Sequence, residues 1–391
     1  MAKKNLGINT ICTHVGEIKD TQFKGAISPM YLSTSYEFED VDVKRYPRYF
    51  NTPNQEFLSK KIAALEHAEA AMIFGSGMAA ISTTLLAFLG AGDHIVLQND
   101  LYGGTRNLIE AQFDRYHIEY TFIEGTSISD FEKAIEANTK MIYIETPSNP
   151  LLKLVDIKAV AKLAKTKKIL TVIDSTFATP VVQNPIDLGI DIVIHSATKY
   201  LGGHSDILAG AVAASQVHID TIWSLAKDLG GSLSDFTVWM LERSMKTLAI
   251  RVKKQNKNAN KMARFLDHHP AVIKVYYPGL ESHPDHELAK SQMRSFGAML
   301  SFELEQKIDT SAFLKALKLI KPSMSLAGVE STMILPYLAS HALLSQEERD
   351  SQGITNGLIR FSVGIEDVKD LKRDIHQAIS QINASALIAN E

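Results

Sequence analysis

Short apolar runs alternate with helical periods between residues 56 and 222. Phe57, Ile62 and Leu65 recur at the spacing of one helix face. The apolar runs that follow are typical of strands covered on both faces. The predicted strands are Ala71–Phe74, His94–Leu97, Tyr120–Ile123, Met141–Ile144, Ile169–Ile173, Ile190–Ile194 and Ile207–Val212. The helices predicted between them are Met78–Leu89, Leu108–Tyr116, Ile128–Ala137 and Ile157–Lys165. This alternation predicts an α/β fold with a mostly parallel central sheet and helices on both faces.

The rhythm changes near residue 234. A helical pattern over 234–265 is too long for the alternation, and we expect it to bridge two domains. Beyond it, strand-like runs and helices predict a smaller α+β domain; the strands are Val272–Tyr276, Met299–Phe302 and Leu358–Val363. The first 55 residues have weak periodicity and several prolines, which is typical of an extended arm. The predicted organisation is an N-terminal arm over 1–55, a large α/β domain over 56–245 and a C-terminal α+β domain over 246–391.

Charge and cysteine content favour a small-molecule partner in a reducing compartment. The 391 residues carry 41 Lys+Arg against 44 Asp+Glu, which gives no basic footprint for nucleic acid or an anionic membrane. The uncharged stretch 70–92 is divided by Gly75-Ser76-Gly77, so we do not expect it to span a membrane. Cys12 stands alone, and no apolar run follows the basic N-terminal residues. We therefore expect neither a disulfide nor a secretory signal, and a cytoplasmic location.

Polar residues follow four of the predicted strands directly. Open α/β sheets bind ligands outside the carboxyl ends of their strands, so these positions are the candidate site. They are Gly75-Ser76-Gly77-Met78 after the first strand, Glu145-Thr-Pro-Ser-Asn149-Pro150 after the fourth, Asp174 after the fifth, and His195-Ser196-Ala-Thr198-Lys199 after the sixth.

One cofactor makes use of all four strand ends. A glycine-rich helix start offers unpaired N–H groups and a positive dipole end to a phosphate, and Ser196 and Thr198 add hydroxyl donors. Lys199 can form a Schiff base with an aldehyde, and Asp174 can keep a pyridine nitrogen protonated so that the ring withdraws electrons. The set predicts pyridoxal phosphate (PLP). Asp174 taken alone is equally typical of a helix cap, and a single Gly-Ser-Gly turn is a weak signal.

At these residues the chain resembles the Cys/Met-metabolism family of PLP enzymes, over nearly its whole length. That family includes cystathionine γ-synthase, cystathionine γ- and β-lyases, methionine γ-lyase and homoserine sulfhydrylases. The motifs that carry the resemblance are Ser76-Gly77-Met78-Ala79, Asp100-Leu-Tyr102-Gly-Gly-Thr105, Glu145-Thr-Pro-Ser-Asn149-Pro, Asp174-Ser-Thr-Phe-Ala-Thr-Pro180, His195-Ser-Ala-Thr-Lys199-Tyr-Leu-Gly-Gly-His204, Ser325-Leu-Ala-Gly-Val-Glu330-Ser and Ile359-Arg360-Phe-Ser-Val-Gly-Ile365. The resemblance implies a type I, aspartate aminotransferase-like PLP fold.

The resemblance also implies a role for each matching residue. Lys199 carries the cofactor and moves protons, Asp174 faces the ring nitrogen, and Tyr102 stacks on the ring. Gly77 and Met78 bind the phosphate through their N–H groups, together with Ser196 and Thr198, and Asn149 lies near the ring hydroxyl. Arg360 holds the substrate α-carboxylate, assisted by Asn149 and Ser325, which is a bidentate task suited to a guanidinium.

Two arm residues are implied to act across a subunit boundary. In the family, Tyr46 and Arg48 reach the phosphate of the neighbouring subunit, so the resemblance implies a homotetramer, a dimer of dimers, with shared active sites. This chain departs from the family pattern, because Asn51-Thr52-Pro53 replaces Asn-Pro-Thr and Pro47 separates the tyrosine from the arginine. Proline fixes φ and restricts the preceding residue, so we expect the local backbone to differ.

The sequence leaves several reactions of the family possible. Arg106, four residues after Tyr102, matches an arginine of members whose substrates have a distal carboxylate, although a surface helix charge is the ordinary alternative. Methionine γ-lyases carry a cysteine where Gly104 stands. We therefore expect a lyase that cleaves L-cystathionine, by β- or γ-elimination, to a thiol amino acid, a keto acid and ammonia. The alternative is cystathionine γ-synthase, which joins cysteine to an activated homoserine.

The same residues also allow two other classes of protein. A non-catalytic PLP-binding protein could use the same fold, since fold does not determine function. A metal hydrolase is suggested only by His283-Pro-Asp-His286, which follows Pro278-Gly279 and lacks further ligands at a suitable spacing, so we expect no metal.

Overall fold

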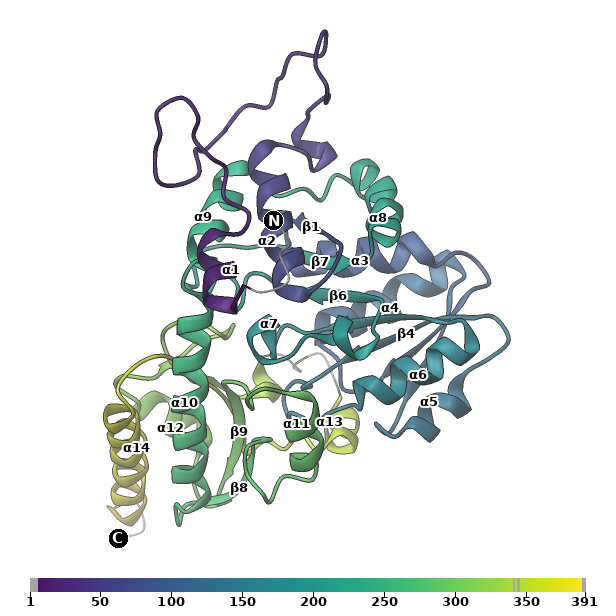
Figure 1. Cartoon of the computed structure of the whole chain (residues 1–391). Helices are drawn as coiled ribbons and strands as arrows, with labels where there is room; N and C mark the ends of the chain where they lie inside the picture. Colours follow the sequence, from purple (N-terminus) through teal and green to yellow (C-terminus); the bar gives the residue numbers. More distant parts are fainter. Residues whose placement is uncertain (1–5, 340–341, 343–344, 389–391) are drawn as a thin grey trace. The chain divides into compact units, whose positions relative to one another are not determined.

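The computed structural model describes residues 6–339, 342 and 345–388 (Figure 1). It divides into two compact units. The first consists of the described residues within 1–99, 104–145 and 155–250, and the second of those within 100–103, 146–154 and 251–391. Over these ranges, none of the helices combines the length and the apolar character required to cross a membrane.

A seven-stranded sheet forms the centre of the first unit, in the order β1-β7-β6-β5-β4-β2-β3. Its strands are β1 (Ala70–Phe74), β2 (His94–Gln98), β3 (Glu119–Ile123), β4 (Thr139–Glu145), β5 (Leu170–Asp174), β6 (Ile192–His195) and β7 (Gly210–Ala214). β2, β3, β4, β5 and β6 pair in parallel with one another, which confirms the predicted mostly parallel sheet. β7 runs antiparallel to both β6 and β1, which agrees with a sheet that is mostly, rather than wholly, parallel. The segment between β6 and β7 contains no helix that could carry the chain across for a parallel return.

Helices of the first unit cover this sheet. They are α1 (Ile8–His14), α2 (Pro53–Glu66), α3 (Gly77–Phe88), α4 (Gly103–Tyr116), α5 (Ile128–Ala134), α6 (Ile157–Lys167), α7 (Thr179–Val182), α8 (Gln216–Leu229) and α9 (Asp235–Met245), with short 3₁₀ turns at Pro47–Tyr49 and Pro185–Leu188. α6 shows why the pattern folds in this way. Ile157, Val160 and Ala164 lie on one side of the helix and pack with Ile142 and Ile144 of β4 in one buried cluster.

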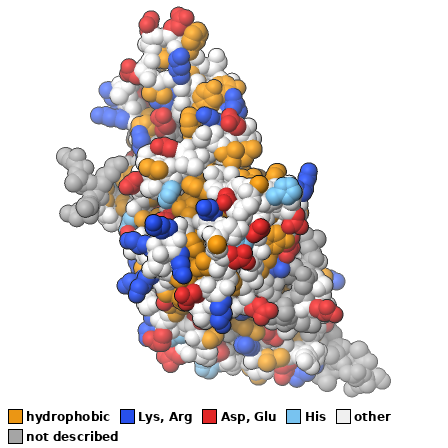
Figure 2. Space-filling model, turned by 90° about the vertical axis from the view of Figure 1, so that its right-hand side faces the viewer, with side chains coloured by type: hydrophobic (Ala, Val, Ile, Leu, Met, Phe, Trp, Pro, Cys, Tyr) orange, Lys and Arg blue, Asp and Glu red, His pale blue; other side chains and the backbone are white. Residues whose placement is uncertain are grey.

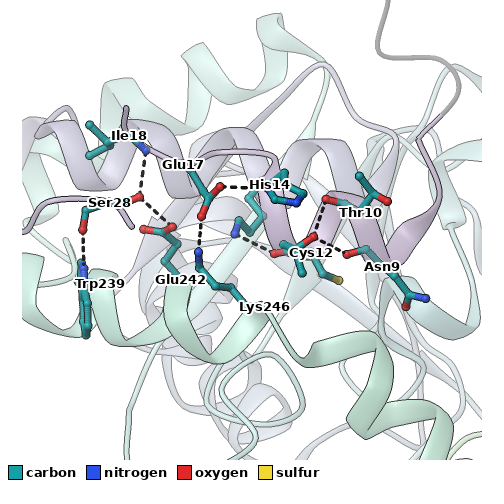
Figure 3. Close-up of polar contacts among 12 residues, drawn as sticks. Asn9, Thr10, Cys12, His14, Glu17, Ile18, Ser28, Trp239, Glu242 and Lys246 are labelled. Atoms are coloured by element: carbon teal, nitrogen blue, oxygen red, sulfur yellow. Dashed lines mark hydrogen bonds and ion pairs between the residues drawn. The ribbon is translucent and has the colours of Figure 1, made fainter. Parts of the chain in front are cut away.

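The N-terminal segment is fixed to α2 and α9 by buried polar contacts (Figure 3). Lys61 Nζ donates to the carbonyl of Cys12 at 2.9 Å, and Ser28 Oγ donates to Glu242 at 2.9 Å. Trp239 Nε1 donates to the carbonyl of Ser28 at 2.9 Å. The segment also forms α1, which its weak periodicity does not predict. Beyond Ser28 the chain is irregular up to the turn that begins at Pro47.

The single helix predicted over 234–265 is wrong. The chain forms α9 and α10 (Leu248–Asp267), with a break at Lys246 and Thr247. At the break, Lys246 N–H donates to the carbonyls of Arg243 and Ser244, so the last turn tightens to i−3 bonds. Thr247 bonds the Ser244 carbonyl through both its N–H and its hydroxyl, at 3.3 and 3.2 Å. A side-chain hydroxyl that binds a nearby carbonyl competes with the backbone hydrogen bonds of the helix. The spacing of apolar residues does not reveal this competition.

The second unit is built on a five-stranded sheet in the order β10-β11-β12-β9-β8. Its strands are β8 (Val272–Tyr276), β9 (Met299–Leu304), β10 (Lys321–Pro322), β11 (Thr332–Ile334) and β12 (Leu358–Ser362). Its helices are most of α10, then α11 (His286–Gln292), α12 (Thr310–Ala316), α13 (Gln346–Gln352) and α14 (Val368–Ile388), with a 3₁₀ turn at Pro336–Leu338. β12 and β9 are antiparallel, with Arg360 opposite Ser301. This α+β arrangement presents Arg360 from the buried interior of a strand.

Candidate active site

The start of α3 forms a cradle with unused backbone donors. Ser76 caps the helix, because its side chain accepts from Ala79 N–H at 3.0 Å and its carbonyl accepts from Ala80 N–H at 3.1 Å. Among the described residues, the N–H groups of Gly77 and Met78 donate to no partner. A Cβ on Gly77 would lie 2.8 Å from Ser196 Cβ, so only glycine permits this approach. The N–H groups and the positive dipole end suit a phosphate.

The turn after β6 carries Ser196, Thr198 and Lys199, and it brings Ser196 against this cradle. Ser196 Oγ lies beside Gly77, 3.0 Å from the position that a Cβ there would take. The Thr198 hydroxyl instead exchanges hydrogen bonds with the backbone of Ala209, at 3.0 and 3.1 Å. Lys199 N–H donates to the Ser196 carbonyl at 3.1 Å, and its side chain is half-buried. The Ser196 hydroxyl therefore lies beside the helix start, whereas the Thr198 hydroxyl bonds the residue that precedes β7.

Asp174 ends β5 as a buried carboxyl, 6% exposed. Burial raises its pKa, and hydrogen bonds from the side chain and backbone of Thr176 and the charge of His195 lower it in part. Thr176 N–H donates to Asp174 Oδ1 at 2.9 Å, while the Thr176 hydroxyl accepts from Ser196 N–H at 2.8 Å. A protonated pyridine nitrogen would give this carboxylate the cation that favours its ionised form.

Sequence reasoning missed two residues of this set. Thr176 joins Asp174 to Ser196, and its signal is the i+2 spacing from an aspartate, typical of a side chain that binds the backbone two residues on. Glu66, at the end of α2, is 1% exposed, and one of its oxygens lies 2.6 Å from His195 Nε2. No sequence pattern connects Glu66 to the strand end, because 129 residues separate it from His195.

The second unit collects the predicted carboxylate-binding residues around Arg360. This arginine is 5% exposed in the middle of β12. One of its NH groups donates to Asn149 Oδ1 at 3.2 Å, and the other to the carbonyl of Ser325 at 2.9 Å. The structure therefore brings together Arg360, Asn149 and Ser325, from segments far apart in the sequence. Two acceptors in fixed positions orient the planar guanidinium, as a bidentate carboxylate contact requires.

Tyr102 precedes α4 and Arg106 lies near the start of that helix; the two residues belong to different units. Tyr102 belongs to the second unit, and its side chain is 45% exposed. Arg106 belongs to the first unit, where its Nε lies 2.8 Å from Glu110 and an NH group donates to Asn99 Oδ1 at 2.6 Å. Its guanidinium also lies 4.4 Å from the centre of the Phe122 ring. The Arg106 side chain, only 15% exposed, is thus not a freely solvated helix charge.

Tyr46 and Arg48 remain together on the exposed arm. The Arg48 guanidinium lies 5.7 Å from the centre of the Tyr46 ring, and its NH1 donates to the carbonyl of Lys227 on α8. The departure at Asn51-Thr52-Pro53 has a local reason. Thr52 is the N-cap of α2 in a capping box with Gln55, and proline occupies the first helical position.

The residues at the ends of β1, β5 and β6 fit PLP. The helix start supplies two unused N–H donors and a neighbouring hydroxyl for a phosphate. Asp174 supplies a buried carboxylate for a pyridinium, and Lys199 follows on the adjacent strand end.

Comparison with known proteins decides the family. The model of the Cys/Met metabolism PLP-dependent enzymes matches residues 9–380. This chain belongs to that family. Cystathionine gamma-lyase of Bacillus subtilis is 43% identical over 98% of this chain and 100% of the relative. Cystathionine beta-lyase MetC of the same organism is 42% identical over 98% of each chain. The crystal structure of cystathionine gamma-lyase from Lactobacillus plantarum, 39% identical, superposes with a TM-score of 0.93 over 97% of this chain and 100% of that one.

These matches confirm the predicted family, its fold and its cofactor, PLP. They do not identify the reaction, since an L-methionine gamma-lyase and a cystathionine gamma-synthase are also among the similar proteins. The protein is therefore a PLP-dependent enzyme of cysteine and methionine metabolism.

The two histidines of the metal alternative have local partners in the second unit. His283 Nδ1 accepts from Asp285 N–H at 3.1 Å, and burial lowers the His283 pKa. His286 Nδ1 lies 2.8 Å from the carbonyl of Pro278, and its ring stacks on Phe296. In the part of the chain that the structure describes, no group of three or more histidine, cysteine, aspartate or glutamate side chains could hold a metal ion.

Proposed function

We propose that the protein is a carbon–sulfur lyase of trans-sulfuration that cleaves L-cystathionine to a thiol amino acid, a keto acid and ammonia. The observation that carries the proposal is that one chain holds both residues that fit PLP, in the first unit, and a buried guanidinium oriented by two acceptors, in the second unit. Relatives named as γ- and β-lyases of cystathionine, each aligned over 98% of this chain, support cystathionine as the substrate.

Each residue of the first unit has one task in this proposal. Gly77 and Met78 hold the cofactor phosphate through their N–H groups, with Ser196 and Thr198 beside them. Lys199 would hold the cofactor covalently, and its amine would move the proton at the substrate Cα. The bound cofactor would supply an electron sink for that carbon, and the ionised Asp174 would favour it.

The remaining residues select an amino acid with two charged ends. Arg360 binds the α-carboxylate, with Asn149 and Ser325 as its supports, and Tyr102 stacks on the cofactor ring. Arg106 binds the distal carboxylate of cystathionine, in exchange for its present contact with Glu110.

We propose further that the active enzyme is a cytoplasmic homotetramer, built as a dimer of dimers in which Tyr46 and Arg48 bind the phosphate of the neighbouring subunit. The arm supports this. Phe23, Leu32 and Phe38 are 80%, 61% and 65% exposed, far more apolar surface than an isolated loop needs. Figure 2 shows hydrophobic side chains exposed among charges of both signs at the height where Figure 1 draws the arm.

The purified holoenzyme given L-cystathionine alone tests the reaction. Rapid release of a keto acid and ammonia supports a lyase, and identification of 2-oxobutanoate or pyruvate distinguishes γ- from β-elimination. Bound PLP without turnover of any sulfur amino acid would contradict the catalytic proposal.

Cystathionine γ-synthase is the second candidate. A solved γ-synthase, from Xanthomonas oryzae pv. oryzae, has the same fold over 97% of this chain, and a distal-carboxylate arginine suits its product equally well. Condensation of O-succinyl- or O-acetylhomoserine with cysteine, without turnover of cystathionine, would establish the synthase and exclude the lyase.

A further inference from the structure

Three polar side chains share one face of the sheet in the second unit. Ser362 follows Arg360 at i+2 on β12, and Ser301 is the Cα partner of Arg360 on β9. Side chains alternate along a strand, and directly paired residues of antiparallel strands project to the same side. Both serines therefore flank Arg360; Ser301 is 0% exposed and Ser362 is 1% exposed.

Each serine is bonded to a different loop. Ser301 Oγ donates to the carbonyl of Pro150 at 2.7 Å. Ser362 Oγ accepts from Ala327 N–H at 2.7 Å. Pro150 directly follows Asn149, and Ala327 lies two residues after Ser325. Asn149 and Ser325 supply the two acceptors of the Arg360 guanidinium.

The loop that carries Ser325 needs such support. Ser325 and Ala327 have φ values of +79° and +70°, in the left-handed region that disfavours residues with a Cβ. A conformation of this kind persists only where its surroundings hold it. Ser362 supplies one such contact, and Gln255 supplies another by donating to the carbonyl of Gly328 at 2.7 Å.

We propose that Ser301 and Ser362 are positioning residues of the α-carboxylate site. Ser301 fixes the loop that presents Asn149, and Ser362 fixes the left-handed turn that presents the Ser325 carbonyl. Together they hold both acceptors that orient Arg360, and so they set the affinity for the amino-acid substrate. This inference rests on the proposed role of Arg360.

Steady-state kinetics of the PLP-loaded variants Ser301→Ala and Ser362→Ala test it. Each change removes one hydrogen bond that fixes an acceptor loop, and the carboxylate contact is made equally in the ground and transition states. We expect KM for the amino-acid substrate to rise about threefold to tenfold in each variant, with kcat within about twofold of the parent. In Ser362→Ala the visible absorbance of bound PLP without substrate should not change, since the covalent and phosphate contacts of the cofactor belong to the first unit.

Ser331→Ala is the matched control. Ser331 is also a fully buried serine of the second unit, and its hydroxyl donates to Glu366 at 2.9 Å and accepts from Gly364 N–H at 2.9 Å. Its loss should lower the unfolding midpoint and leave KM unchanged. An equal KM rise in Ser331→Ala, or an unchanged KM in both Ser301→Ala and Ser362→Ala, would overturn the inference.

An Arg360→Leu variant separates this inference from the proposed function. If Arg360→Leu raises KM steeply while the two serine variants do not, only the positioning role fails. If Arg360→Leu leaves KM unchanged, the assignment of the carboxylate site itself is wrong.

Discussion

Replacement of Gly77 by alanine tests the phosphate cradle. The new Cβ would lie 2.8 Å from Ser196 Cβ and 3.0 Å from Ser196 Cα, and the second of these is a backbone atom that cannot rotate away. Carbon atoms pack at about 3.5–4.0 Å, so the helix start and Ser196 must separate by roughly 0.7 Å or more. Alanine is the better helix former, by up to about 1 kcal/mol, but overpacking costs about 1–3 kcal/mol. We therefore expect the clash to outweigh the gain in helix propensity.

The separation acts directly on the bound phosphate. Hydrogen bonds require about 2.7–3.2 Å between donor and acceptor, and those to a charged group contribute about 1.5–3 kcal/mol each. Loss of one such bond corresponds to an increase of about 10- to 100-fold in the Kd for PLP. Titration of the apoprotein with PLP, followed by visible absorbance, measures this directly.

Gly75→Ala is the matched control in the same turn. A Cβ there would meet the carbonyls of Gly231 and Ser232 at 3.5 Å, an ordinary contact distance. We expect its Kd for PLP to equal that of the parent. Parental affinity in Gly77→Ala would refute the cradle, and equal weakening in both variants would show that the turn, rather than the approach to Ser196, matters.

Three further predictions follow from single contacts. Lys199→Ala should bind PLP without the covalent link that borohydride reduces, and its turnover should fall by at least about 10³-fold; parental turnover would contradict the proposed role. Arg106→Leu should raise KM for cystathionine about tenfold or more but leave KM for a sulfur amino acid without a distal carboxylate unchanged, and equal effects on both substrates would indicate a structural role only. Burial raises the pKa of Glu242 above its usual 4.5, while Lys61 opposes the shift. Its contribution to the stability of the native state is therefore present below pH 4.5 and lost as the pH rises through the raised pKa. Glu242→Gln should gain stability relative to the parent over that interval in denaturant unfolding, whereas a pH-independent difference would contradict this.

The sequence predicts which residues stand at one edge of the first unit's sheet, because these residues follow strand ends. In a parallel sheet the carboxyl ends of neighbouring strands meet at one edge, and Asp174 is the partner of Ile194, on the strand that Lys199 follows. Gly77 opens a helix at the same edge. Their neighbours are less visible. Thr176 contacts Ser196 across 20 residues and Glu66 contacts His195 across 129, and such pairs depend on packing rather than on spacing.

The surroundings of Arg360 could not be predicted from the sequence in full. Arg360 stands out because a charged residue inside the apolar run 358–363 must have a partner. Which partner it has depends on the register of β12 against β9. A slip of one residue would turn Ser301 to the opposite face of the sheet and move the Pro150 carbonyl away from its donor. Both strands are buried almost throughout, so either register would bury a similar area, and the polar contacts of Ser301 and Ser362 distinguish one register from the other. The two serines therefore fix the pairing of β12 with β9 as well as the guanidinium. We expect the double variant, Ser301→Ala with Ser362→Ala, to raise KM by more than the product of the increases in the two single variants.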